Sequence, residues 1–202
     1  MTGPGPCATR LLTHPLVQPD NTSCGAASLV VAQAVVDDAY AELVVDGTHP
    51  GTGFAASGSK AVDRFQQETL AMHRRVTSLV AVSGRLQLPW PSALGTPPWA
   101  VANQLSARGA SYGTHVVRTR PDSAYLLALP ALERQVPVAF YVGDQWLPRH
   151  VVLGIGTAPH DSLRIYDPAL GGVRVVTRQA FATTTLPFGR WSHAWFVVTP
   201  GA

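Results

Sequence analysis

The chain has 202 residues, of which 13% are charged and 46% are hydrophobic, and its formal net charge is +3. This length suits a single domain with a full-sized core, and the composition excludes a disordered chain. The 15 Lys and Arg residues are scattered without a run, so no nucleic-acid partner is expected. No segment reaches the roughly 18 apolar residues of a membrane span.

The N-terminal stretch lacks the charged and apolar regions of a Sec signal, which predicts a cytoplasmic protein and leaves other export routes open. Two cysteines, Cys7 and Cys24, are too few for a disulfide framework, and a bond between them is the lesser alternative. No Cys/His spacing resembles a zinc site, and no Gly-rich stretch has a phosphate-loop context. We therefore expect neither a metal nor a cofactor. The sequence leaves the oligomeric state open.

In chain order, residues 1–15 are expected to form a flexible leader. A turn-rich stretch from Gln18 to Gly25 then opens a helix that is apolar on most faces and therefore buried. Helices are expected over about 25–44, 59–77, 98–108 and 123–134, the second of them polar and exposed. A Gly/Thr loop over 46–58 and a Pro/Trp-rich loop over 84–98 lie between them.

After residue 134 the pattern changes to short β-rich runs separated by turns. Strands are expected over 136–142, 150–156, 162–167, 173–177 and 194–198. A helical half with a buried central helix, followed by an antiparallel β half, predicts one α+β domain.

Cys24 is the candidate nucleophile. Asn21, Thr22 and Ser23 are natural N-cap residues, which place Cys24 at the start of the buried helix. The positive end of a helix favours the thiolate, which is the reactive form of cysteine. The alternative is an inert buried cysteine, since free cysteine is among the most buried residue types.

Gln18 lies six residues before Cys24, across a Pro/Asn turn. Its side-chain amide is placed to join the backbone N–H of Cys24 as an oxyanion donor, and losing one such donor typically costs about 10²–10³ in rate. The alternative is a solvated loop glutamine.

His150 is the candidate general base among the histidines, because it opens a strongly apolar strand directly after a polar loop. Asp167 ends the next strand and is followed by a proline. If the two strands form a hairpin, Asp167 lies beside His150, where a carboxylate orients the imidazole and stabilises its cation. The alternative for Asp167 is an Asp-Pro turn residue.

Gln18 and the Cys24-Gly25 pair, then HVVLGIG and IYDPALGG, together resemble the papain-like cysteine peptidases. The nearest branch is family thirty-nine, the double-glycine (bacteriocin leader) peptidases and their soluble relatives. The resemblance covers about residues 16–45 and 97–198, so residues 46–96 are expected to be an insertion atypical of the family. Ala26 follows Cys-Gly where the family often has Pro or Gln.

The resemblance implies a papain-like fold and a reaction in which Cys24 attacks a peptide or amide carbonyl. His150 would be the general base and acid, Asp167 would orient it, and Gln18 would help form the oxyanion hole. Leader processing is not the reaction expected of this chain, because the family members that process leaders are usually attached to ABC transporters. Trp90, Trp99, Trp146 and Trp191 are candidates to line the cleft, and a structural role is equally compatible with each.

Three hypotheses follow. The chain is a thiol hydrolase of a peptide or amide, or an acyl- or peptidyl-transferase that uses the same trio, as in transglutaminase and phytochelatin synthase. The third is a papain-like domain that has become a non-catalytic binding module.

Overall fold

The computed structural model describes residues 4–48, 60–78, 80, 84, 88, 95–107 and 109–201. The helices are α1 (Pro6–Leu11), α2 (Cys24–Val36), α3 (Asp38–Asp46), α4 (Ala61–Thr77), α5 (Pro98–Ser106), α6 (Asp122–Glu133) and α7 (Arg178–Ala182). The strands are β1 (Tyr112–Val116), β2 (Val138–Gly143), β3 (Pro148–Ala158), β4 (Ser162–Asp167), β5 (Gly172–Thr177) and β6 (His193–Pro200).

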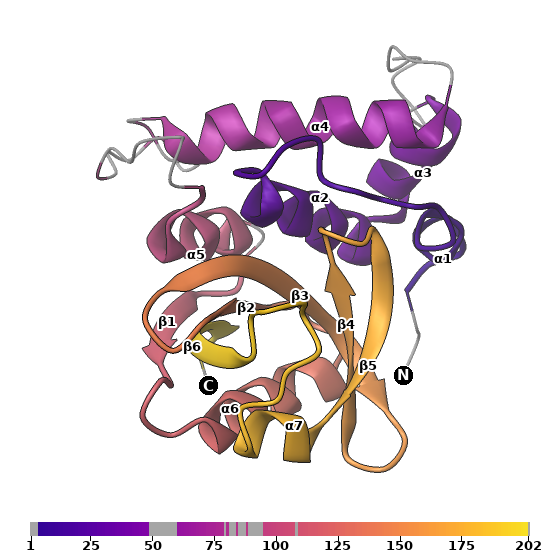
Figure 1. Ribbon diagram of the computed structural model, residues 1–202. Helices are drawn as coiled ribbons and strands as arrows, with labels where there is room; N and C mark the ends of the chain where they lie inside the picture. Colours follow the sequence, from indigo (N-terminus) through magenta and orange to yellow (C-terminus); the bar gives the residue numbers. More distant parts are fainter. Residues whose placement is uncertain are drawn as a thin grey trace.

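The strands form one sheet in the order β1-β6-β2-β3-β4-β5, and every neighbouring pair is antiparallel. Figure 1 shows α2, α3, α4 and α5 stacked over one side of this strongly curved sheet, with α6 and α7 on the other. The predicted α+β class is confirmed. The five predicted strands are present within two residues at each end, and β1 completes the sheet.

The sheet is buried on both faces because successive side chains point to opposite sides. Along β2, Ala139 and Tyr141 join the core cluster under α2, whereas Val138, Phe140 and Val142 join the cluster under α6 and α7. This explains why the strand reads as a continuous apolar run rather than an alternating one.

The helix predicted over 25–44 is two helices. Asp37 has extended backbone dihedral angles (φ −138°, ψ 96°), and its side chain accepts a hydrogen bond from the backbone N–H of Tyr40 at 3.1 Å. The aspartate therefore ends α2 and caps α3. α2 itself is buried along nearly its whole length, as predicted.

Within the expected flexible leader over residues 1–15, Pro6–Leu11 form the helix α1. Its Ala8 and Leu11 are buried, and the Asp38 carboxylate accepts hydrogen bonds from the backbone N–H groups of Cys7 and Ala8 at 2.9 and 3.0 Å. A carboxylate on the N-terminus of α1 satisfies donors that a helix cannot pair internally.

α4 is the described helical part of residues 46–96. It was expected to be exposed, yet Phe65 is completely buried and Met72 lies in the same core cluster as α2. Tyr40 donates a hydrogen bond to the Glu68 carboxylate at 2.8 Å, and Arg64 donates to the carbonyl of Val44 at 2.9 Å. α4 is thus an integral layer of the domain. Among the described helices, none has the length and apolar character that crossing a bilayer demands.

Candidate active site

Cys24 is the first residue of α2 and is only 6% exposed. The first N–H groups of a helix have no partner within it, so the thiol sits at the positive end of a 13-residue helix. Gly25 follows it where space is short, because a Cβ atom there would lie 2.6 Å from the Cβ atom of Thr96. The absent side chain lets the loop before α5 lie against the start of α2.

His150 and Asp167 are hydrogen-bonded. His150 Nε2 donates to Asp167 Oδ1 at 2.8 Å, and both side chains are buried. The antiparallel pairing of β3 with β4 creates this contact: Leu153 lies opposite Tyr166, so the start of β3 runs past the end of β4. The predicted proximity of the two side chains is found, for the predicted reason.

The imidazole of His150 lies between that carboxylate and the thiol of Cys24. Burial alone disfavours the charged ring, but hydrogen bonds to Asp167 and Cys24 outweigh it and raise the pKa of His150 to about 9. Because Nε2 is engaged by Asp167, Nδ1 is the nitrogen left for the thiol. A protonated imidazole next to a cysteine favours the thiolate.

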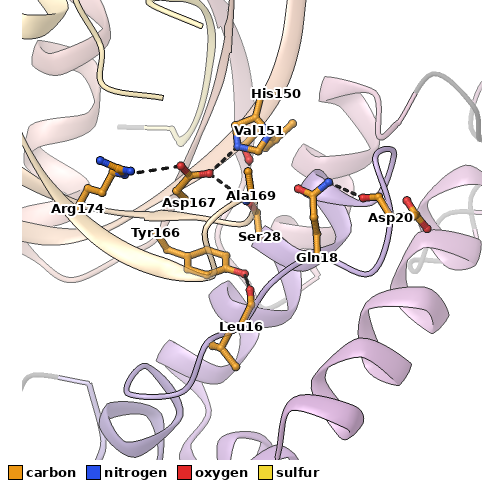
Figure 2. A network of polar contacts seen from close by, with 10 residues as sticks. All are labelled: Leu16, Gln18, Asp20, Ser28, His150, Val151, Tyr166, Asp167, Ala169 and Arg174. Carbon is orange, nitrogen blue, oxygen red and sulfur yellow. Dashed lines mark hydrogen bonds and ion pairs between the residues drawn. The ribbon is translucent and has the colours of Figure 1, made fainter. Parts of the chain in front are cut away.

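Asp167 has three further contacts, and Figure 2 draws the two that its side chain makes, with Ala169 and Arg174. Its Oδ1 accepts a hydrogen bond from the backbone N–H of Ala169 at 3.0 Å, and its Oδ2 lies 3.8 Å from Arg174 Nε. Its backbone carbonyl accepts from the N–H of Gly171 at 2.8 Å. The turn from β4 to β5 therefore fixes the carboxylate that orients His150.

Arg174 was not singled out from the sequence, although the turn residues contain a signal for it. Asp167 pairs with Gly172 across the hairpin, and side chains two residues apart share a face. Arg174 is therefore placed on the same side as the end of β4.

Trp191 stacks on His150, with ring centroids 4.6 Å apart and planes inclined by 27°. Trp191 was a candidate from the sequence to line the cleft, and in the structure its ring lies against His150. No local pattern predicts this contact, because Trp191 lies in the irregular segment before β6.

The side-chain amide of Gln18 donates from Nε2 to the backbone carbonyl of Asp20 at 2.5 Å, while its Oε1 is buried without a partner among the described residues (Figure 2). An amide nitrogen carries two hydrogens, so one N–H of Gln18 is left to donate elsewhere. Gln18 lies six residues before Cys24 in the irregular segment that leads into α2, and it is not among the described residues that line the cavity.

The segment that carries Gln18 is attached to the turn that carries Asp167. The N–H of Gln18 donates to the carbonyl of Pro168 at 2.9 Å, and the N–H of Leu16 donates to that of Gly171 at 2.9 Å. The buried Tyr166 hydroxyl donates to the carbonyl of Leu16 at 2.5 Å. The amide and the carboxylate are therefore positioned by one hydrogen-bonded unit.

A cavity of about 740 Å³ opens directly onto Cys24 and His150. Its described lining comes from the turn before α2, the start of α5 and strands β1, β2, β3 and β6. Trp99 lines it, as the sequence suggested. Trp146 does not line it and is 74% exposed, and Trp90 lies outside the described residues.

Among the described residues, His150 is the histidine that lines the cavity. His73 is buried on α4, in the segment over 59–77 that was expected to be a polar, exposed helix. Within the described residues, no group of three His, Cys, Asp or Glu side chains is arranged to hold a metal ion.

No family model and no curated protein matches the chain. Among solved structures, it is similar to the peptidase domain of Streptococcus ComA, a bi-functional ABC transporter involved in a quorum-sensing pathway. That likeness has 14% identity and a TM-score of 0.47 and covers 92% of this chain and 96% of that one.

The peptidase domain of Streptococcus mutans ComA is also similar, with 14% identity and a TM-score of 0.36 over 67% of this chain and 89% of that one. At these values the likeness carries no functional argument. The residues of the site itself have to support any function assigned to the chain.

Proposed function

We propose that the protein is a thiol hydrolase that cleaves a peptide or amide bond through an acyl-enzyme on Cys24. The observation that carries the proposal is the buried His150 ring, held between the Cys24 thiol and the Asp167 carboxylate. A nucleophile, a base and a group that orients the base are the parts that nucleophilic catalysis requires.

In the proposed reaction, the Cys24 thiolate attacks the carbonyl carbon and the electron pair moves to the carbonyl oxygen. The backbone N–H of Cys24 and the remaining N–H of Gln18 donate to that oxyanion. When the C–N bond breaks, the leaving nitrogen takes a proton from His150. Water then gives its proton to His150 and attacks the thioester, and the C–S bond breaks to restore the thiolate and the imidazolium.

Asp167 has a positioning role in this scheme. Its hydrogen bond to Nε2 directs Nδ1 at the thiol and stabilises the imidazolium, as a carboxylate does in the triads of other hydrolases. The resemblance of the sequence to papain-like peptidases assigns the same roles to the same residues.

The test is to incubate the protein with a mixture of synthetic peptides and to read new termini by mass spectrometry. We expect cleavage by the native chain and by Cys7→Ser, no cleavage by Cys24→Ala, and an acyl adduct on the Cys24 tryptic peptide after rapid acid quenching. Equal cleavage by native and Cys24→Ala protein would overturn the proposal. No cleavage and no adduct would favour a binding module.

A second arm adds a labelled primary amine, because the same trio performs transfer when an amine replaces water. Free acids as the main products support hydrolysis. Amide products that carry the label would reassign the protein as an acyltransferase with the same nucleophile.

A further inference from the structure

Three large apolar side chains are exposed at one end of the sheet. Val116 is 71% exposed, Trp146 is 74% exposed and Leu147 is 50% exposed. The first ends β1 and the other two lie in the turn from β2 to β3, and both β1 and β2 end beside the start of β6. Exposed apolar side chains are ordinary when they are scattered singly, whereas a group of them indicates an interaction surface.

Polar contacts join the end of β1 to this turn. Arg118, two residues after Val116, donates to the carbonyl of Gln145 at 3.0 Å. Its guanidinium carbon lies 5.0 Å from the centre of the Trp195 indole, which itself donates to the carbonyl of Asp144 at 3.0 Å. The exposed apolar residues of β1 and of the turn therefore belong to one surface.

The turn has a fixed backbone. The N–H groups of Trp146 and Leu147 donate to the Asp144 carboxylate at 2.7 and 2.9 Å. These two hydrogen bonds lower the pKa of Asp144, so the carboxylate stays charged and keeps the turn closed. A turn that is already ordered presents its side chains to a partner without a further entropy cost.

Arginines that are far apart in the sequence meet at this turn. Arg118 reaches it as described, and Arg149 Nε lies 3.9 Å from the Asp144 carboxylate. Arg190 is exposed, and its charge also acts to lower the pKa of Asp144. Among the described residues, Asp144 is the carboxylate that balances these three arginines, so the group has a formal charge of +2. We call the combined set the β2–β3 surface: Val116, Arg118, Trp146, Leu147, Arg149 and Arg190.

Arginines elsewhere on the chain are matched one to one with carboxylates. Arg10 forms a salt bridge with Asp46 at 2.5 Å, and Arg178 donates twice to Asp122, at 2.9 and 2.8 Å. The β2–β3 surface therefore combines an excess of positive charge with exposed apolar side chains. Both features are typical of the boundary between water and lipid, where an indole lies at the level of the headgroups and arginines attract anionic lipids.

From these observations we propose that the β2–β3 surface binds the face of a bilayer that contains anionic lipids. Its apolar side chains enter the headgroup region, and its arginines contact lipid phosphates. Val116 and Trp146 project outward, which favours a lipid surface over an extended peptide as the partner. Leu147 and Arg149 also line the cavity beside Cys24, so binding brings that cavity next to the membrane. The inference does not depend on the proposed hydrolase function.

The test is co-sedimentation of the full chain with vesicles. One set of vesicles is phosphatidylcholine alone, and the other is equal parts of phosphatidylcholine and phosphatidylglycerol. We expect binding to the mixed vesicles and little to phosphatidylcholine alone. Binding should also weaken as the Debye length falls from about 10 Å at 0.1 M salt to about 3 Å at 1 M.

A pair of double variants tests the arginines. Arg149→Gln with Arg190→Gln should weaken binding to the mixed vesicles about 25-fold, or about fivefold for each arginine removed. Lys60→Gln with Arg134→Gln is the control, because it removes the same charge from two exposed residues outside the β2–β3 surface. An equal effect of the two double variants would show that net charge alone drives binding and would overturn the proposed surface.

A pair of leucine variants tests the apolar contact. Leu147 and Leu170 are 50% and 53% exposed, and Leu170 lies in the turn from β4 to β5. We expect Leu147→Ala to weaken vesicle binding about fivefold to tenfold and Leu170→Ala to change it less than about twofold. Trp146→Phe should remove most of the blue shift in tryptophan fluorescence that the native chain shows on binding.

Three further outcomes would overturn the proposal once circular dichroism shows that the variants are folded. The first is no binding to the mixed vesicles at low salt, and the second is an equal loss in Leu147→Ala and Leu170→Ala. The third is binding of poly-glutamate through Arg149 and Arg190 without binding of vesicles, which would reassign the surface to acidic peptides. Since no outcome uses peptide cleavage, the hydrolase proposal is tested separately.

Discussion

The indole of Trp191 lies nearly parallel to the imidazole of His150, 4.6 Å away, and covers the ring that binds Asp167. A hydrogen bond between charged groups is stronger where water is excluded. The indole therefore shields the hydrogen bond between His150 and Asp167, which in the proposed reaction keeps the base oriented.

Replacing Trp191 should weaken the proposed activity through His150. We expect Trp191→Ala to lower kcat about tenfold and to raise the pH at which activity is lost, because water then reaches the imidazole and relieves the burial that disfavours its charged form. Trp191→Phe should restore most of both properties. A pH–rate profile of the three proteins makes the measurement, and an unchanged profile for Trp191→Ala would contradict the protective role.

The pH dependence of activity should follow His150. Burial opposes the charged ring, but Asp167 and Cys24 raise the pKa of His150 to about 9, so the imidazolium is present at neutral pH and is lost as the pH rises through about 9. We expect kcat/KM to fall over that range. Asp167→Asn removes one of the two raising partners and should move the fall to lower pH.

The same pKa shift predicts a contribution to stability with a defined sign. The folded-state pKa of His150 is above the ordinary value of 6.5, so the contribution is complete below about 6.5 and disappears as the pH rises through about 9. Urea unfolding at pH 6 and pH 9.5 measures it. The loss should be smaller in Asp167→Asn than in the native chain.

Alkylation should distinguish the two cysteines, both of which are free thiols. Burial and the neighbouring Asp38 and Glu42 raise the pKa of Cys7, which lowers its thiolate fraction. Cys24 begins α2 and lies beside His150, and both positions are typical of a reactive cysteine. At pH 6 we expect iodoacetamide to modify Cys24 much faster than Cys7, as peptide mapping would show, and the ratio of the two rates should fall in His150→Ala.

Gln18→Ala should lower kcat by about 10²–10³ with little change in KM, because the proposed donor acts on charge that develops only in the transition state. Gln179→Ala, on the exposed side of α7, is a matched control and should leave kcat unchanged. If the two variants had the same kcat, Gln18 would be no oxyanion donor.

Gly171 is a point where stability and the site are linked. Its φ is +67°, and a Cβ atom would lie 2.6 Å from the backbone nitrogen of Val17. We expect Gly171→Ala to lower the free energy of unfolding by about 1–3 kcal/mol. It should also lower kcat, because Leu16 and Gln18 are attached to the same turn. Gly172→Ala, with nothing within 4 Å, is the control, and urea unfolding compares them.

Local pattern was enough to predict the β half and the meeting of His150 with Asp167. Apolar runs bounded by turns defined the strands, and an antiparallel hairpin of known length brings its two ends together. The position of Cys24 also followed from local signals, since cap residues precede the helix that it begins.

Other features depend on contacts between distant parts of the chain. The sequence from Cys24 to Asp46 has one continuous apolar pattern, yet Asp37 ends α2 and caps α3. α1 is a short helix stabilised by the Asp38 carboxylate. His73 became buried because α4 packs on α2. The contact of Trp191 with His150 depends on how an irregular segment folds back, which no periodicity encodes.

Cys24 begins a helix of one layer, whereas His150 and Asp167 belong to strands of the layer beneath it. The thiol and the imidazole thus meet where the helical layer packs on the sheet. Each layer keeps its own hydrogen bonds if this packing loosens. A slight separation of the two layers would end the proposed activity while the helices and strands persist. Loss of the proposed activity with heat or denaturant would therefore report the packing of the two layers against each other rather than the loss of secondary structure.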